Sequence, residues 1–490
     1  MNRLRHASQE RVTFNWNGSP IEGRAGDTVA AALYASGIKA IARSRKRHSP
    51  LGLSGGHLSG ILARVNGRPN VRLDLEPVIE GLDARMQNVW PSERFDVLAA
   101  AQILPSRWLH AGFEHTRLLP SGTWRFQAWE RLLAFLAGMS PPPDSNLPAA
   151  VRTGRRISVD TVVVGGGPAG RAAANDAAST GQRTLLVSRG TFPGRYARAW
   201  DAPLPALDAG VDVITGSEVF GLYREGCLVA AAPHDHAAGA VVFDCKRVIL
   251  ATGRRSIPPL VRGNHVPGVL DAHTALLLAT DYGVAPGGAV AVVGTGEETP
   301  LAERLKRLGV NIVYVGSVTA LRRVIGRRGV DAIELGRITP CDALVHAGPW
   351  HADPGLLFQA KAEGFTQLSP TESGNNVTAV GAAAAPPEPV AIGERDLAKA
   401  LVCPCMDVTA GEVLDWIRHG ETDVEVLKRV TGCGMGPCQG MPCWEMLAEL
   451  VAKKTSLPAS DIGRPSHRPP RRALTVAQAA GLDRLVEPER

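Results

Sequence analysis

The chain lacks the features that mark membrane-embedded and exported proteins. No apolar run in its 490 residues approaches the roughly 18 residues that a membrane-spanning helix needs. The N-terminal stretch MNRLRHASQERVTF is polar and has no apolar centre of the kind found in signal peptides. We therefore expect a cytoplasmic protein with no membrane span and with reduced thiols. In that setting clustered cysteines indicate metal binding rather than disulfides.

Aromatic residues are also scarce, at 5% of the chain, and the net charge of +7 is modest for this length. The arginines are scattered, apart from residues 43–47 and the late run RPSHRPPRR. No stacking platform or recognition motif accompanies the positive charge, so we expect no nucleic-acid partner. We find neither a paired acid and base nor a nucleophilic triad, and we assign no catalytic residue.

Cysteine is absent before position 227, yet five of the eight cysteines fall between positions 403 and 443. Cys403 and Cys405 form a C-x-C pair, and Cys438 and Cys443 form a C-x4-C pair, with a helical stretch between the pairs. Close thiolate pairs on two loops bind Fe–S clusters or zinc. We favour an Fe–S cluster, with zinc and four structural thiols as the alternatives. Cys433 has no partner at a matching spacing, so we expect a packed residue or a stand-in ligand.

Composition divides the chain into five regions. Asn-Gly pairs at 17–18 and 66–67 predict two hairpins near the N-terminus. Near-continuous apolar strands later alternate with helical stretches, which indicates an α/β region whose parallel sheet is buried on both faces. The expected regions are a small α+β domain at 1–95, a connector at 96–155, a nucleotide-binding domain at 156–395 with an insert at about 265–335, a cysteine-bearing domain at 396–460 and a tail at 461–490.

The run DTVVVGGGPAG predicts a dinucleotide-binding loop, because a buried strand leads through a Gly-x-Gly-x-x-Gly motif into a helix of small residues. The next strand ends at Ser188 and Arg189, where an acidic residue usually binds the ribose hydroxyls. Serine can still bind one hydroxyl, and arginine can meet a phosphate. The loop residues that we expect at the nucleotide are Gly165, Gly167, Pro168, Ala169 and Gly170.

A second, weaker motif, AVAVVGTGEETP, keeps Gly294 and Gly296 but has Thr299 in the third glycine position. It predicts either a nicotinamide nucleotide site or a scaffold without a ligand. Between the two motifs a strand enters an Ala-Thr-Gly turn at Thr252 and Gly253. Together these motifs resemble the flavoproteins with two dinucleotide-binding domains, one for FAD and one for a nicotinamide nucleotide. That resemblance implies that a later glycine, Gly381, closes the flavin site.

The run LKRVTGCGMGPCQGMPC resembles the [2Fe-2S] module, of the bacterioferritin-associated ferredoxin type, in α subunits of heteromeric amine dehydrogenases. This family includes sarcosine oxidase, hydrogen cyanide synthase, opine oxidase and dye-linked proline dehydrogenase. The resemblance extends over the chain through AGDTVAAALYASG, MQNVWPSERFDV and AGFEHTRLLP. It implies a two-dinucleotide-domain flavoprotein fold, an N-terminal ferredoxin-like (β-grasp) domain and a C-terminal helical [2Fe-2S] domain. The implied cluster ligands are Cys403, Cys405, Cys438 and Cys443.

The same resemblance implies FAD and a [2Fe-2S] cluster as cofactors. An FMN at a subunit interface, and NAD(P) or another adenine nucleotide, are further candidates. The implied partner is a β subunit of the D-amino-acid-oxidase-like flavoprotein type, with a small third subunit and a peripheral electron acceptor as further candidates. Because the N-terminal ferredoxin-like domain has no cysteine, we expect a scaffold there rather than a second cluster.

Three functions follow as hypotheses. The first is the electron-transferring α subunit of a heteromeric amino-acid, opine or sarcosine-type dehydrogenase or oxidase, whose substrate is oxidised on the β subunit. The second is a free-standing NAD(P)H-dependent flavoprotein reductase with an Fe–S exit. The third is a scaffold that has lost its cofactors. Flavin reduction by NADH or NADPH in the isolated chain would favour the second, whereas the absence of both flavin and Fe–S signals would favour the third.

Overall fold

The computed structural model describes residues 3–4, 10–44, 46–54, 61–93, 95–103, 122–136, 152–223, 228–235, 238–353, 355–362, 377–393, 395–436, 438–459, 461–465, 470–472 and 474–486. Its contacts divide the chain into two compact units. Unit 1 comprises residues 1–147, 256–349 and 389–465, and unit 2 comprises 148–255, 350–388 and 466–490. Among the described helices, none combines the length and apolar character needed to cross a membrane. The proline-rich linker at 139–148 and the run AGFEHTRLLP lie outside the described residues.

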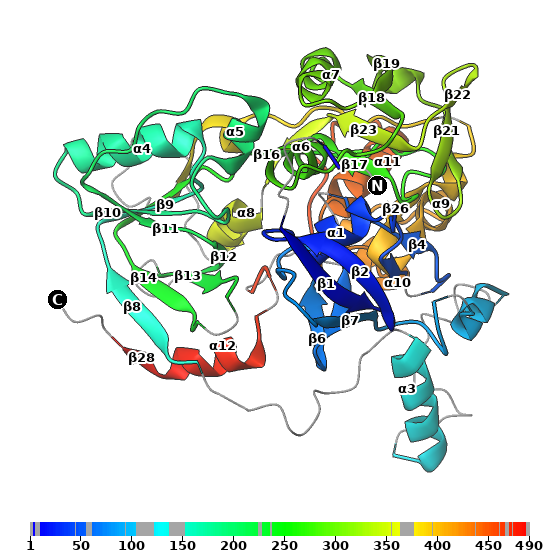
Figure 1. The fold of residues 1–490 in the computed structure, drawn as a ribbon, viewed down its shortest axis with the longest axis horizontal. Coiled ribbons are helices and arrows are strands. Elements are labelled where there is room, and N and C mark those ends of the chain that lie inside the picture. The colour runs from blue at the N-terminus through cyan, green and yellow to red at the C-terminus, as the bar shows by residue number, and fades with distance from the viewer. Residues whose placement is uncertain are drawn as a thin grey trace. The chain divides into compact units, whose positions relative to one another are not determined.

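Unit 1 begins with a five-stranded sheet of order β2-β1-β7-β5-β6 (Figure 1). Its strands pair antiparallel except for β1 with β7, which are parallel. The two predicted hairpins are confirmed, because Asn17 and Gly18 join β1 to β2, and Asn66 and Gly67 join β5 to β6, all with positive φ. The elements are β1 (Arg11–Trp16), β2 (Ser19–Arg24), the buried helix α1 (Val29–Ala35), β5 (Leu62–Val65), β6 (Arg68–Arg72) and β7 (Asp83–Met86).

The middle part of unit 1, residues 256–349, covers the insert expected at about 265–335. Its four strands are all parallel, in the order β17-β23-β18-β19. Between β19 and β23 the chain forms a three-stranded antiparallel sheet, β20-β21-β22. The elements are β17 (Val269–Asp271), α6 (Ala272–Asp281), β18 (Val290–Gly294), α7 (Glu298–Arg307), β19 (Ile312–Ser317), β20 (Arg323–Gly326), β21 (Val330–Glu334), β22 (Ile338–Pro340) and β23 (Ala343–Ala347).

The last part of unit 1 carries the cysteines on a short hairpin and three helices. Helix α9 begins with a capping box, in which the Thr409 side chain accepts from the Glu412 backbone and the Glu412 carboxylate accepts from the Thr409 N–H. Gly432, in the left-handed conformation, ends α10. The elements are β26 (Leu401–Cys403), β27 (Val408–Thr409), α9 (Ala410–Arg418), α10 (Val424–Thr431) and α11 (Cys443–Thr455).

Unit 2 contains the parallel sheet predicted for the first nucleotide motif, in the order β11-β10-β9-β15-β25. The chain moves outward from β9 to β10 and β11, then returns to β9's other side as β15, so the sheet has its topological switch point at β9. Open α/β sheets bind ligands at such a point, at the carboxyl ends of the strands. The elements are β9 (Thr161–Val164), α4 (Pro168–Ser179), β10 (Thr184–Val187), β11 (Val211–Ile214), β15 (Arg247–Leu250) and β25 (Val377–Ala379).

The segment predicted as a C-terminal tail contributes to a second sheet of unit 2, of order β12-β13-β14-β8-β28. Its last strand, β28 (Leu485–Val486), pairs in parallel with β8 (Gly154–Ser158). Helix α12 (Val476–Ala480) precedes that strand, and both are drawn in red in Figure 1. The remaining strands are β12 (Ser217–Tyr223), β13 (Leu228–Pro233) and β14 (Val241–Asp244).

Candidate iron-sulfur and nucleotide sites

Five cysteines converge in unit 1 from three separate segments. Cys403 is the last residue of β26, and Cys405 lies in the 3-10 turn that follows it. Cys433 and Cys438 lie on the glycine-rich loop after α10, and Cys443 is the first residue of α11. All five side chains are at most 4% exposed. A helix N-terminus favours a thiolate, so the position of Cys443 suits a metal ligand.

The sulfur atoms are close enough to share a metal centre. Cys403 Sγ lies 3.8 Å from Cys405 Sγ, and Cys405 Sγ lies 3.5 Å from Cys438 Sγ. The Sγ atoms of Cys403, Cys433 and Cys443 all lie within 4.8 Å of one another. Two sulfurs bound at about 2.3 Å to one tetrahedral metal would be about 3.8 Å apart. The donor set and its spacing therefore fit a thiolate-bound metal centre. Cys433, which has no partner at a matching spacing in the sequence, lies within this group of sulfur atoms.

Burial and mutual hydrogen bonding divide the protons unequally among these thiols. Hydrogen bonds from Cys405, Cys433 and Cys443, with one from the backbone N–H of Gly434, hold the pKa of Cys403 well below its ordinary value. The pKa values of Cys405, Cys433 and Cys443 lie well above the ordinary value, with the hydrogen bond to Cys403 as the first cause of each and burial as a further one. A bound metal cation would favour the thiolate form of these cysteines and so oppose the effect of burial.

Glycines allow the loop to approach the sulfurs and a neighbouring indole. A Cβ placed on Gly436 would lie 2.3 Å from Cys405 Sγ. Cβ atoms on Gly434 and Gly440 would lie 2.0 and 2.2 Å from the Trp444 ring, and both glycines have positive φ. The run GCGMGPCQG is therefore glycine-rich because the backbone must pass directly against Cys405 on one side and Trp444 on the other.

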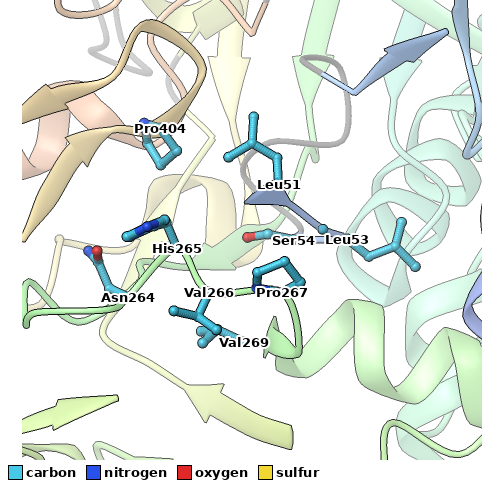
Figure 2. Close-up of a pocket in the computed structure, with 10 residues that line it drawn as sticks. Leu51, Leu53, Ser54, Asn264, His265, Val266, Pro267, Val269 and Pro404 are labelled. Atoms are coloured by element: carbon cyan, nitrogen blue, oxygen red, sulfur yellow. The ribbon is translucent and has the colours of Figure 1, made fainter. Parts of the chain in front are cut away.

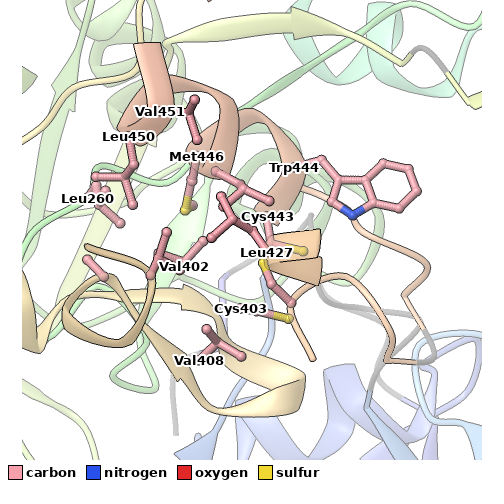
Figure 3. Packing of buried hydrophobic residues seen from close by; sticks show 14 of the residues in the cluster. Leu260, Val402, Cys403, Val408, Leu427, Cys443, Trp444, Met446, Leu450 and Val451 are labelled. Carbon is pink, nitrogen blue, oxygen red and sulfur yellow. The ribbon is translucent and has the colours of Figure 1, made fainter. Parts of the chain in front are cut away.

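An apolar core surrounds the cysteines (Figure 3). Side chains from the hairpin and from α9, α10 and α11 contribute to it, and these side chains exclude water from the sulfur cluster. Solvent exclusion of this kind is one of the factors that set the potential of an Fe–S centre. The fully buried members include Val402, Val408, Val413, Leu427, Met446, Leu447 and Val451.

A buried carboxylate next to the C-x-C pair binds this loop to the N-terminal domain. Asp407 has positive φ and accepts hydrogen bonds from Ser44 Oγ and from the backbone N–H groups of Lys46 (3.2 Å) and Arg47 (2.7 Å). Lys46 also forms an ion pair with Glu412, at 3.7 Å. Ser44, Lys46 and Arg47 thus hold the loop that carries the C-x-C pair.

A small pocket lies between residues 51–54, residues 264–269 and Pro404 (Figure 2). Pro404 stands between Cys403 and Cys405, so the pocket borders the C-x-C loop. Its volume, as the space open to the centre of a water molecule, is about 20 Å³. That space holds about one water and is far too small for a flavin. The pocket can therefore hold a water molecule beside the C-x-C loop but has no room for a cofactor.

The first nucleotide motif lies at the switch point of the unit 2 sheet. Gly165 follows β9, and a Cβ there would lie 2.2 Å from the Ala251 carbonyl oxygen. A Cβ on Gly170 would lie 1.9 Å from the Gly165 oxygen, so α4 packs against the strand only through glycine. Gly167, the N-cap of α4, has no atom within 4 Å of its Cβ position. Its backbone is therefore open to an approaching pyrophosphate, as the motif predicts.

Two later segments meet this loop at the same edge of the sheet. The Thr252–Gly253 turn follows β15, whose neighbour β9 runs parallel to it. Thr252 Oγ1 donates to the Asp353 carbonyl oxygen at 3.4 Å. A Cβ on Gly381, which follows β25, would lie 2.5 Å from the Ala169 Cβ. The structure therefore brings the predicted residues of all three segments together.

The strand end with the unusual Ser-Arg pair contains an ion-pair network that the sequence did not indicate. Ser188 is buried, and its N–H donates to the Ile214 carbonyl oxygen. Arg189 donates to the Tyr196 hydroxyl at 2.8 Å and lies 3.8 Å from Glu218. Glu218 in turn accepts from Arg472 at 2.7 Å. The residue spacing of the nucleotide motif could not reveal Glu218, because this residue lies on β12, in the second sheet of unit 2.

The second nucleotide motif, in unit 1, is occupied by a side chain of its own helix. Glu298 Oε2 accepts from the Gly296 N–H at 2.7 Å, and a Cβ on Gly294 would lie 2.7 Å from the same oxygen. The N–H group that would bind a phosphate thus already binds a carboxylate, whose negative charge repels a pyrophosphate. This geometry counts against a nicotinamide nucleotide at the loop.

Three family models match separate parts of the chain. A 2Fe-2S iron-sulfur cluster binding domain matches residues 9–89, a pyridine nucleotide-disulphide oxidoreductase matches residues 159–333, and a BFD-like [2Fe-2S] binding domain matches residues 401–453. The first match is to the domain that contains no cysteine. The chain therefore keeps the fold of that family without its thiolate ligands, whereas the third match covers all five clustered cysteines.

Two curated relatives match parts of the chain. The chain is 32% identical to the alpha subunit of sarcosine oxidase from Rhizobium meliloti (strain 1021) over 338 residues, which cover 62% of this chain and 34% of that relative. It is 38% identical to the A subunit of opine oxidase from the same organism over 88 residues, which cover 18% of this chain and 19% of that one. The chain thus matches about a third or less of the length of these relatives.

Among solved structures, L-proline dehydrogenase from P. horikoshii matches 98% of this chain and 99% of its own, with a TM-score of 0.74 and 20% identity. At that identity the match supports the fold. It agrees with the predicted α/β architecture and its flanking ferredoxin-like and BFD-like domains. By sequence the chain is similar to parts of a sarcosine oxidase α subunit and an opine oxidase A subunit, and it combines matches to a 2Fe-2S iron-sulfur cluster binding, a pyridine nucleotide-disulphide oxidoreductase and a BFD-like [2Fe-2S] binding domain.

Proposed function

We propose that this chain is the electron-transferring α subunit of a heteromeric, flavin-dependent amine dehydrogenase or oxidase. A partner β subunit would oxidise the amine, and bound flavin and [2Fe-2S] groups on this chain would supply the one- and two-electron chemistry needed to pass its electrons onward. The work of the chain's own residues is then to hold these groups, to exclude water from them and to set their potentials.

The buried cysteine cluster is the observation that carries this proposal. In unit 1, four thiols at the predicted C-x-C and C-x4-C spacing lie in an apolar core, with Sγ distances of 3.5 and 3.8 Å where pairs meet. Purely structural thiols have no need to gather from three segments. We propose Cys403, Cys405, Cys438 and Cys443 as the cluster ligands, in agreement with the BFD-like match over residues 401–453.

We further propose that the switch point of unit 2 binds FAD. The open backbone at Gly167, the close α4–β9 packing at Gly170 and the closing glycine Gly381 support a dinucleotide there. The Ser188 hydroxyl would accept a hydrogen bond from a ribose hydroxyl in place of the usual carboxylate, and Arg189 would meet a phosphate. We also propose that an FMN binds at the interface with the partner subunit. Such a site would be formed by residues of both chains.

The partner enters the proposal through the relatives, which are named as an alpha subunit of sarcosine oxidase and an A subunit of opine oxidase. We propose a β subunit of the amine-oxidising flavoprotein type. The N-terminal domain, which has no cysteine to bind a cluster, would act as a scaffold. Its buried contacts around Asp407 support that role, because they position the cysteine loop.

The alternative, a free-standing NAD(P)H-dependent reductase, requires a nicotinamide nucleotide at the second motif. The Glu298 carboxylate on the Gly296 N–H opposes this. The decisive experiment is anaerobic reduction of the native, co-purified complex with a panel of secondary amines and amino acids, and separately with NADH and NADPH. Flavin bleaching by an amine, and none by either nicotinamide nucleotide, is the expected result. Bleaching of the isolated chain by NADH or NADPH would replace this proposal with the reductase.

A further inference from the structure

Cys433 lies inside the cysteine cluster although the four proposed ligands already complete a [2Fe-2S] site. Its side chain is fully buried. Its Sγ lies within 4.8 Å of both Cys403 Sγ and Cys443 Sγ, and those two also lie within 4.8 Å of each other. A fifth thiol at this distance from two proposed ligand sulfurs is close enough to take part in the cluster.

Local structure fixes Cys433 in this position. Its backbone N–H donates to Thr431 Oγ1 at 3.1 Å, and that hydroxyl donates to the Leu427 carbonyl oxygen at 2.6 Å. Gly432, in the left-handed conformation, turns the chain at the end of α10 immediately before it. Cys403 is the last residue of β26, and Cys443 is the first residue of α11. The three sulfurs therefore meet from three anchored segments.

We propose that Cys433 is a reserve cluster ligand, which can take the coordination position of Cys403 or Cys443. This inference rests on the proposed four-thiolate cluster. Cys433 Sγ lies within 4.8 Å of the sulfurs of both Cys403 and Cys443, so a movement of its side chain and loop of at most that length would bring it to either position. In the exchange the Cys433 thiol releases its proton to solvent and its sulfur forms the bond to iron that the missing cysteinate would have formed. No oxidant or reductant is involved.

The reserve-ligand role predicts that the five cysteines respond unequally to substitution. Cys403→Ala and Cys443→Ala should each keep about half or more of the iron of the unaltered protein, with altered g values in paramagnetic resonance. The double variants Cys403→Ala/Cys433→Ala and Cys443→Ala/Cys433→Ala should lose almost all iron. Cys433→Ala alone should retain the cluster, because the four ligands remain.

The test measures iron, acid-labile sulfide and the paramagnetic resonance spectrum of each variant in the full chain. Reconstitution of purified variants with Fe²⁺ and sulfide distinguishes impaired assembly from a missing ligand, and thermal unfolding checks each fold. Iron retained by either single variant and lost when Cys433→Ala is added supports the proposal. Loss of iron from both single variants, even after reconstitution, overturns it. An unaltered chain that binds no iron would instead refute the proposed function.

Discussion

Cys405 Sγ and Cys438 Sγ lie 3.5 Å apart, although 33 positions separate the two residues in the sequence. The separation matches the edge of a thiolate tetrahedron around a metal. The contact joins the C-x-C pair to the C-x4-C pair, so the two pairs form one group instead of two separate ones.

Removing one member of that contact should remove the metal. Cys405→Ala or Cys438→Ala removes one of the four proposed ligands of the cluster. Because thiolate ligands hold the irons, we expect iron content to fall about tenfold or more. Iron and acid-labile sulfide analysis checks this. Cys341→Ala is the matched control, because Cys341 is equally buried within unit 1 but belongs to another core cluster. Full iron content in Cys405→Ala would exclude that residue as a ligand.

Gly436 should tolerate no side chain. Because its Cβ would lie 2.3 Å from Cys405 Sγ, Gly436→Ala should displace the sulfur and lower iron content severalfold. Gly463→Ala is the control, since the nearest atom to its Cβ position is 3.9 Å away. Iron content and the visible spectrum of the cluster provide the measurement. Equal iron in the two variants would show that the glycine-rich loop is not fitted to the sulfur.

The nucleotide loop offers a substitution that changes binding and leaves the fold intact. Gly167→Ser meets no atom within 4 Å, keeps a non-positive φ and supplies a good helix N-cap. Its side chain would fill the space through which a pyrophosphate approaches, so we expect nucleotide affinity to fall about tenfold, or about 1.4 kcal/mol. Titration with FAD after cofactor removal, together with the melting temperature, checks this. Unchanged affinity would place the nucleotide elsewhere.

A buried ion pair in unit 2 should make its stability sensitive to acid. Burial raises the pKa of Asp353, but Arg471 and Arg255 outweigh that effect and hold the pKa well below its ordinary value. A depressed pKa stabilises the folded state above the unfolded-state value of about 4, and this stabilisation is lost as pH falls below it. Asp353→Asn should lower the free energy of unfolding by about 3 kcal/mol at pH 7.

Urea unfolding at several pH values tests this prediction. The difference between Asp353→Asn and the unaltered protein should shrink as the pH falls below about 4. Asp244→Asn breaks a more exposed pair with Arg156 and should cost less than about 1 kcal/mol. Equal effects of the two substitutions would mean that the Asp353 ion pair stabilises unit 2 no more than an exposed pair does.

Much of the fold could be predicted from local patterns. The apolar runs TVVV, TLLV and RVIL are the central strands of the unit 2 sheet, because continuous apolar character suits strands covered on both faces. The two Asn-Gly hairpins form because such pairs adopt positive φ easily at both turn positions. These features depend on residues close in sequence.

The features that sequence reasoning missed depend on residues far apart. Arg472, in the segment expected to be a plain tail, donates to Glu218, 254 positions earlier. The spacing of Cys433 gave no partner, yet its loop brings it to Cys403. Glu298 could have been noticed, since a carboxylate in the first turn of a helix can bind the loop's own N–H groups. Ion pairs and loop contacts between residues far apart in the chain leave no periodic pattern in the sequence.

The central claim is that the C-terminal cysteines bind a [2Fe-2S] cluster. Metal and acid-labile sulfide analysis of the complex purified without air tests it most directly, combined with paramagnetic resonance after reduction. We expect two irons and two sulfides per chain, with a signal from the reduced cluster that disappears in Cys405→Ala. One zinc per chain, with neither iron nor sulfide, would contradict the claim.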